Sequence, residues 1–178
     1  MNQQTNEQLW KKCVEFHGHH CPGLAIGVRA SQEAIKALGI NFAKDEEVVV
    51  ISENDACGVD GVQVILGCSA GKGNLIFRNR GKQAFSFFNR TTGENLRLVL
   101  KSLPEMSRDE MEAYILNEPD ATKIFDFKTP SYELPEKARI FESYICEACG
   151  EKTAEHMIRL ENGKKICLDC LNDYTRGF

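Results

Sequence analysis

The residues of this chain that offer the most chemistry are its eight cysteines, and they form two groups. Four precede residue 69 (Cys13, Cys21, Cys57 and Cys68) and four follow residue 145 (Cys146, Cys149, Cys167 and Cys170). The polar start, MNQQTNEQ, does not resemble a signal peptide, so we expect a cytoplasmic, reducing environment. Thiols in such an environment serve as metal ligands or reactive groups more often than as disulfides. Two groups of cysteines therefore predict two sites in two modules.

The four late cysteines follow the pattern C-x2-C-x17-C-x2-C, with Gly150 directly after the first pair. A two-residue gap lets both sulfurs of a pair reach one tetrahedral ion, so this spacing is typical of structural zinc. We predict zinc bound by these cysteines (Cys146, Cys149, Cys167 and Cys170) in a treble-clef or ribbon finger. A hairpin turn is expected at 161–164 and a short helix through Leu171 and Tyr174. Two redox dithiols or two disulfides are the alternative, which the spacing disfavours.

The early group combines thiols with imidazoles. Three of the four histidines lie within four residues of Cys21, at positions 17, 19 and 20, and Cys57 follows an expected strand and opens an expected helix. Cysteine and histidine near helix starts suit a transition metal or a nucleophilic thiol. We take His17, His19, Cys21 and Cys57 as candidate ligands of a second metal in a cleft. Alternatively, the histidines cap helices or face solvent, and the cysteines fill small apolar gaps.

The glycine-rich stretch 67–73, GCSAGKG, invites comparison with a phosphate-binding loop. That motif needs four residues between its first glycine and Gly-Lys, followed by Ser or Thr, whereas here there are three, followed by Gly73. The P-loop interpretation therefore fails. A backbone anion site with Lys72 as countercharge and a plain helix-to-strand turn are the two interpretations that stay open.

These residues must be positioned by an α+β core. Helices are expected from a Thr5 cap to Gly18, from Pro22 to Gly39, over 59–66, and from a Ser107 capping box to about Asn117. Strands are expected over 48–51, 75–78, 83–88 and 96–100. We expect strands 75–78 and 83–88 to pair as a hairpin across 79–82. Helices followed by strands and another helix indicate an α+β fold with a mixed or antiparallel sheet.

Length and charge limit the remaining possibilities. The chain has 178 residues, enough for one core and a small second module, and its formal net charge is −4. This balance argues against a nucleic-acid partner, and the absence of a long apolar run argues against a membrane span. The proline-containing segment TPSYELPEK, residues 129–137, is typical of an extended connector. We therefore expect a core at 1–128, a connector at 129–144 and the finger at 145–178.

Several motifs together resemble the FmdE family, which is named for formylmethanofuran dehydrogenase. They are FHGH-x-CPGL at 16–24, Asp55-x-Cys57, Gln63 with GC-x-x-GKGNL at 67–75, and ARIF at 138–141 leading into Cys146-x-x-Cys149-Gly150. The resemblance implies an α+β core, a homodimer, and a cleft of His and Cys residues completed by the glycine-rich segment. It thus makes Asp55, Cys68, Ser69, Lys72 and Asn74 candidate ligand-binding residues.

Three functions compete on this basis. The first is a metal-binding accessory protein of a molybdenum or tungsten oxidoreductase, with a His/Cys cleft for a metal or small ligand. The second is a stand-alone enzyme that uses a metal or a thiolate in the same cleft. The third is a zinc-finger module that docks onto a larger protein assembly, for which its mixed charges are suitable.

Overall fold

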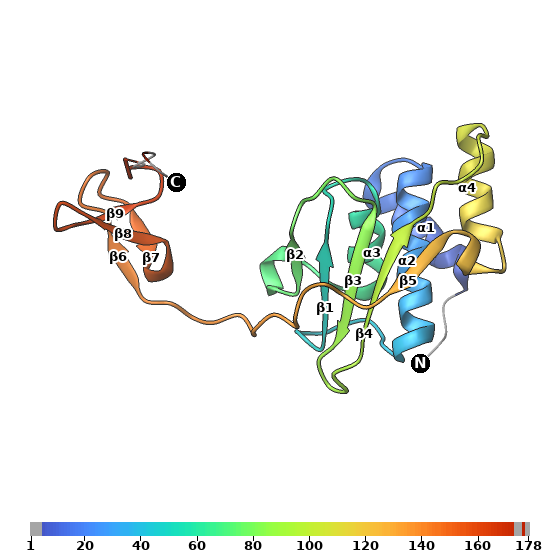
Figure 1. Ribbon diagram of the computed structural model, residues 1–178, viewed down its shortest axis with the longest axis horizontal. Helices are drawn as coiled ribbons and strands as arrows, with labels where there is room; N and C mark the ends of the chain where they lie inside the picture. Colours follow the sequence, from blue (N-terminus) through green and yellow to red (C-terminus); the bar gives the residue numbers. More distant parts are fainter. Residues whose placement is uncertain (1–4, 173–175, 177–178) are drawn as a thin grey trace. The chain divides into compact units, whose positions relative to one another are not determined.

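A computed structural model of the protein describes residues 5–172 and 176 (Figure 1). Its contacts divide the chain into two compact units, Met1–Ala138 and Arg139–Phe178. Each unit is described by itself below. Within the described residues, no helix has both the length and the apolar character needed to cross a membrane.

The first unit is built on a five-stranded sheet with the order β2-β1-β3-β4-β5. The strands are β1 Val48–Ser52, β2 Leu75–Phe77, β3 Ala84–Asn89, β4 Asn95–Leu100 and β5 Phe125–Lys128. Strand β1 pairs in parallel with β2, and all other neighbours are antiparallel. The mixed sheet with its helices confirms the predicted α+β fold.

Four α-helices lie on one face of this sheet (Figure 1). They are α1 Asn6–His17, α2 Pro22–Leu38, α3 Gly58–Leu66 and α4 Arg108–Asn117, and two short 3-10 helices, η1 Ala70–Lys72 and η2 Ala121–Lys123, lie between the elements. The predicted capping boxes form at Thr5 and Ser107, where each side chain accepts the backbone N–H three residues later. Gly18 and Gly39 end the first two helices in the left-handed conformation.

Side chains alternate between the two faces of the sheet, as the strand period requires. Val48, Val50, Phe85, Phe87 and Leu98 point toward the helices and form the main core with them. On the opposite face a smaller cluster is formed by Val49, Ile51 and Phe88 with the partly buried Ile76 and Tyr132. Strand β1 is consequently buried on both faces, which explains its continuous run of β-branched residues.

The predicted hairpin between strands 75–78 and 83–88 is wrong. Strand β1 lies between β2 and β3 and pairs with both of them, so the segment that follows β2 carries the chain across the end of β1. Backbone N–H groups of Arg80 and Lys82 in this segment donate to the carbonyl of Glu53, at the end of β1. The turn-like sequence between the two strands thus bends around a third strand. Strand β5 was also not predicted.

The first ten residues after β5 pack against the first unit. Tyr132 joins the small cluster on the outer face of the sheet, with the Arg78 guanidinium 4.6 Å from its ring centre. Further along, Arg90 Nη1 donates to the carbonyl of Pro135 (2.8 Å), and the N–H of Ala138 donates to Glu46 Oε1 (3.1 Å). This part of the expected connector is therefore attached to the outer face of the sheet.

The second unit consists of two short hairpins. Strands β6 Ser143–Ile145 and β7 Lys152–Ala154 form one, and β8 Ile158–Glu161 and β9 Lys164–Cys167 form the other, after a 3-10 helix, η3 Glu155–Met157. The predicted turn at 161–164 is confirmed: Asn162 and Gly163 have φ of 50° and 80°, as a tight hairpin turn requires. Leu171 and Asn172 are not helical, and Tyr174 lies outside the described residues.

Candidate metal centres

The finger brings its four cysteines together. The sulfurs of Cys146, Cys149, Cys167 and Cys170 lie within 4.8 Å of one another. Cys146 and Cys149 belong to the turn between β6 and β7, and Cys167 ends β9. Gly150 has a φ of 78°, and its N–H donates to the carbonyl of Cys146 (2.9 Å), which closes the knuckle. Four sulfurs at this spacing match the closed tetrahedral shell of structural zinc.

The surroundings of Cys146 favour a thiolate. The N–H of Cys167 donates to Cys146 Sγ at 3.3 Å. Backbone N–H groups of Cys149, Cys167 and Ala148 lower the pKa of Cys146 to about 6. The neighbouring Cys167 and Cys149 sulfurs raise the pKa of Cys170 to about 12, because adjacent thiolates repel one another. A bound cation would offset that repulsion.

The second cluster lies at the amino-terminal ends of α2 and α3. Cys21 is the N-cap of α2, where the N–H of Leu24 donates to its Sγ (3.3 Å), and Cys57 directly precedes α3. Ligand atoms of His17, Cys21 and Cys57 all lie within 4.8 Å of one another. His17 reaches this point from the last turn of α1. The positive ends of two helices thus converge on two thiols, an arrangement that favours negative charge on sulfur.

Two glycines allow α2 and α3 to come this close. A Cβ on Gly27 of α2 would lie 1.8 Å from the carbonyl oxygen of Gly58, and a Cβ on Gly61 would lie 2.8 Å from the N of Val28. Any side chain at either position would push the helices apart. Because each helix begins at one of the two cysteines, this close crossing fixes where the two thiols meet.

His17 is oriented by a carboxylate. Its Nδ1 lies 2.7 Å from Asp60 Oδ2, and its Nε2 lies 3.9 Å from Cys21 Sγ. Metal-binding histidines usually donate their second ring N–H to a carboxylate or carbonyl, which fixes the tautomer and raises the basicity of the ligand nitrogen. The sequence patterns did not identify Asp60. Its position one helical turn after Cys57 was visible, but its pairing with a residue 43 positions away was not.

The pKa of Cys57 is raised, first by burial and then by the adjacent Cys21 thiol. Two thiolates side by side in a partly buried place repel each other, so a cation would stabilise the ionised pair. Two thiolates and one imidazole suit zinc and other thiophilic transition metals. Three protein ligands leave a coordination position open, as catalytic or exchangeable metal sites do. The residues present therefore fit a metal.

The other candidate residues are placed as follows. His19 is exposed, its ring centre lies 4.4 Å from that of His17, and it does not belong to the three-residue cluster. Asp55 is exposed and lines the cavity of about 430 Å³ that also contains His17, Cys57 and Asp60. His20 Nδ1 lies 3.0 Å from Glu112 Oε2 at the surface.

The glycine-rich segment lies further along α3. Cys68 is fully buried, its thiol donates to the carbonyl of Val48 (3.6 Å), and burial raises its pKa to about 12. The Asn74 amide Nδ2 donates to the carbonyls of Asp45 and Val48, and its Oδ1 accepts the N–H of Ser69. These contacts fasten the loop to the core. Neither Ser69 nor Lys72 lines the cavity at the three-residue cluster.

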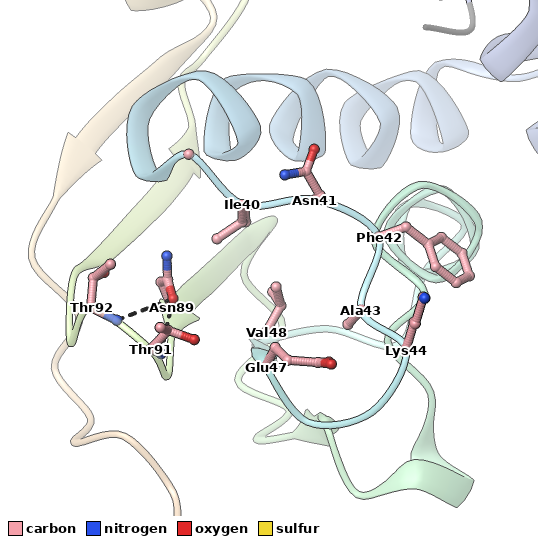
Figure 2. Close-up of a pocket in the computed structure, with 11 residues that line it drawn as sticks. Ile40, Asn41, Phe42, Ala43, Lys44, Glu47, Val48, Asn89, Thr91 and Thr92 are labelled. Atoms are coloured by element: carbon pink, nitrogen blue, oxygen red, sulfur yellow. Dashed lines mark hydrogen bonds between the residues drawn. The ribbon is translucent and has the colours of Figure 1, made fainter. Parts of the chain in front are cut away.

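A further cavity, of about 410 Å³, lies on the other side of the segment between α2 and β1. Figure 2 shows it between this segment and the β3–β4 turn, with Asn89, Thr91 and Thr92 on the far wall. The Asn89 amide is already engaged, because its oxygen accepts N–H groups of Thr91 and Thr92 and its nitrogen donates to the carbonyl of Leu38. This cavity contains none of the candidate metal ligands.

The fold and the two clusters thus define an α+β protein with a thiolate–imidazole site and a four-cysteine finger. Comparison with known proteins agrees. Residues 16–148 match the family model described as "FmdE, Molybdenum formylmethanofuran dehydrogenase operon". Residues 139–176 match the prokaryotic dksA/traR C4-type zinc finger. The chain belongs to the FmdE family and carries a C4-type zinc finger.

Two individual proteins are similar to the chain. The crystal structure of an FmdE-like protein of tungsten formylmethanofuran dehydrogenase from Syntrophus aciditrophicus is 23% identical, with a TM-score of 0.68, covering 94% of this chain and 92% of that one. A probable S-adenosyl-L-methionine-binding protein of Archaeoglobus fulgidus is 30% identical over 94% of this chain. The chain spans about half, 53%, of the length of this second relative. The structural similarity supports the fold.

Proposed function

We propose that the protein is a metal-binding accessory protein of a molybdenum or tungsten oxidoreductase, with a second transition metal at His17, Cys21 and Cys57. The observation that carries the proposal is the convergence of these three ligand atoms within 4.8 Å. The His17–Asp60 contact supports it, because a carboxylate behind an imidazole is the usual companion of a metal-bound histidine. The open coordination position would let the ion hold a further ligand.

The association with such an oxidoreductase rests on the family. The matching family is described by the operon of molybdenum formylmethanofuran dehydrogenase, and the similar crystal structure is of an FmdE-like protein of the tungsten enzyme. The mixed charge of the finger suits a protein partner. We also infer a cytoplasmic homodimer in which the finger zinc is structural.

Copurification tests the association. The full chain, affinity-tagged and purified anaerobically from its host, is expected to bring down components of a molybdenum- or tungsten-containing oxidoreductase, identified by mass spectrometry. The Cys21→Ser/Cys57→Ser chain is the matched control, since it retains the finger and loses the proposed cleft metal. Recovery of the wild-type chain without any such component would count against the association. Equal recovery with both chains would assign docking to another surface.

A second candidate, a small-ligand-binding protein or stand-alone enzyme that uses the same site, is favoured by the cavity. About 430 Å³ of space lies directly beside Cys57 and His17, which is enough for a small organic molecule. The Archaeoglobus relative is named a probable S-adenosyl-L-methionine-binding protein. Titration calorimetry with S-adenosyl-L-methionine tests this candidate: saturable binding by the wild-type chain that Cys57→Ser weakens would support it, and no heat of binding would remove that ligand.

A further inference from the structure

The exposed side of α3 joins the thiolate–imidazole site to a second cavity. The cavity beside Cys57, lined by Asp60 and Gln63, is continued by a cavity of about 380 Å³ lined by Gln63 and Val64. Gln63 belongs to both walls. Residues 60, 63, 64 and 67 are spaced by three or four, so they lie on one side of the helix and form the floor of a single groove. We call this the α3 groove.

The walls of the α3 groove are unusually apolar for a surface. Three phenylalanines stand beside it, from α1, the α2–β1 segment and β2: Phe16, Phe42 and Phe77 are 58%, 62% and 47% exposed. Figure 2 shows the Phe42 ring turned away from Asn89 and Thr91 and away from the cavity between them. The ring instead lies against the end of α3, close enough to Gly67 that a Cβ there would be 2.7 Å from it.

A cation closes the far end of the α3 groove. Lys72 Nζ donates one hydrogen bond, to the carbonyl of Ala43 (2.9 Å), and lies 5.8 Å from the Phe42 ring centre. An ammonium has three N–H donors, so two remain for another acceptor. None of the ion pairs formed by the described residues involves Lys72. An unneutralised, half-buried ammonium next to apolar walls suits a carboxylate with a hydrocarbon body.

We propose that the α3 groove binds a small organic carboxylate with an apolar body, which places its carboxylate on Lys72 and its other end at the thiolate–imidazole site. Seven residues separate Asp60 from Gly67, which corresponds to about 10 Å along the helix axis. The ligand therefore needs a body of about this length. The inference deepens the proposed function, on which the role of its second end rests. It assigns that site a class of ligand.

Octanoate is a suitable probe, because it has one carboxylate and a chain of about the required length. Titration calorimetry on the full-length protein is expected to show saturable binding of octanoate and much weaker binding of octylammonium and butyrate. Lys72→Gln and Phe42→Ala should each weaken octanoate binding about tenfold, through loss of a charge-assisted hydrogen bond and of apolar contact respectively. Lys72→Arg should restore most of the affinity.

The matched control is Lys44→Gln, which removes a lysine from the same α2–β1 segment but lines the other cavity. It should bind octanoate like the wild type. Binding is measured with and without added zinc, since the contacts at Lys72 and Phe42 do not need the metal. Metal stoichiometry, measured separately, therefore tests the proposed metal site independently of the groove.

Three results would overturn the proposal: octanoate and octylammonium binding equally well, octanoate binding unaffected by Lys72→Gln, or no octanoate binding at all. In the last case sedimentation of the wild-type and Phe42→Ala proteins identifies the other occupant. If Phe42→Ala converts a dimer into a monomer, a second copy of the chain covers the phenylalanines in place of a small molecule.

Discussion

The two cysteine sites of this protein are built in opposite ways. In the finger, four sulfurs are supplied by a knuckle and hairpins, and the buried apolar side chains that the structure describes around them are few: Ile166, with the partly buried Leu171. In the core, two sulfurs and one imidazole lie at the ends of helices that are packed on a five-stranded sheet. The finger thus has ligands enough to close a metal shell and little else to hold it together.

The difference separates two roles for a metal. Where the fold depends on the ion, every coordination position is used by the protein and the site is structural. Where helix packing holds the ligands in place without the ion, the protein can leave one position open. We therefore expect the finger to require its metal for folding and the core to fold with or without one.

Removal of metal should produce the largest effect and should divide the molecule. Structural zinc contributes about 10–16 kcal/mol of binding free energy in finger peptides, which a unit of this size cannot replace. After treatment with a strong chelator, hydrogen exchange should show loss of amide protection in β6–β9 and retention in β1, β3 and α2. Zinc addition should restore the finger. Persistent protection of β8 and β9 without metal would contradict this role of zinc.

The core should instead depend on its own interactions, of which the Glu53–Arg97 pair is an example. Arg97 Nε and Nη2 donate to the two Glu53 oxygens at 2.6 and 2.8 Å, and Glu53 is 2% exposed. Glu53→Gln leaves a buried guanidinium without its countercharge, so we expect a loss of about 3–5 kcal/mol in the free energy of unfolding. Asp126→Asn, in an exposed pair with Lys101, should cost less than about 1 kcal/mol.

The same pair sets a pH dependence. Hydrogen bonding to Arg97 holds the pKa of Glu53 below its ordinary value of 4.5. Its contribution is therefore complete above pH 4.5 and is lost as the pH falls through the lowered pKa. Urea unfolding of the wild type should show this loss on the acid side. Glu53→Gln should have a flatter acid limb, and identical pH profiles for the two proteins would contradict the assignment.

The close helix crossing gives a smaller and more local effect. Gly27→Ala forces α2 away from α3, and we expect a loss of about 1–3 kcal/mol, together with weaker metal binding at Cys21 and Cys57. Gly71→Ala is the matched control, since a Cβ there meets nothing within 4 Å. Denaturant unfolding and competitive metal titration measure the two effects. Unchanged metal affinity in a destabilised Gly27→Ala would show that the crossing does not position the thiols.

The carboxylate behind His17 should have the smallest effect on stability and a clear one on metal. Asp60→Asn keeps the size of the side chain but removes the charge that orients the imidazole, so metal affinity at the core site should fall about 10–100-fold. Glu112→Gln, which changes the surface contact of His20, should leave the affinity unchanged. Competition with a chromophoric chelator gives both values, and equal affinities for the two variants would remove Asp60 from the site.

What the sequence predicted well depends on local chemistry. The helix caps at Thr5 and Ser107, the left-handed glycine after α1 and the Asn162–Gly163 turn all follow from neighbouring residues, and the structure confirms them. The four-cysteine spacing belongs to the same class, because the knuckle is a local backbone conformation.

What failed depends on contacts distant in sequence. The expected hairpin after β2 was wrong because β1, 25 residues earlier in register, pairs between the two strands. The pairing of His17 with Asp60 and the closeness of Gly27 to Gly58 are likewise set by helix packing. No spacing rule within one segment could reveal them.

Metal content per chain tests the central contrast most directly. The full-length protein, purified anaerobically and analysed by plasma mass spectrometry, should contain two metal ions per chain. Cys146→Ser/Cys149→Ser and Cys21→Ser/Cys57→Ser should each contain one. A wild type with one ion, falling to none in Cys146→Ser/Cys149→Ser and staying at one in Cys21→Ser/Cys57→Ser, would contradict the contrast and leave the core cluster as a metal-free pair of thiols.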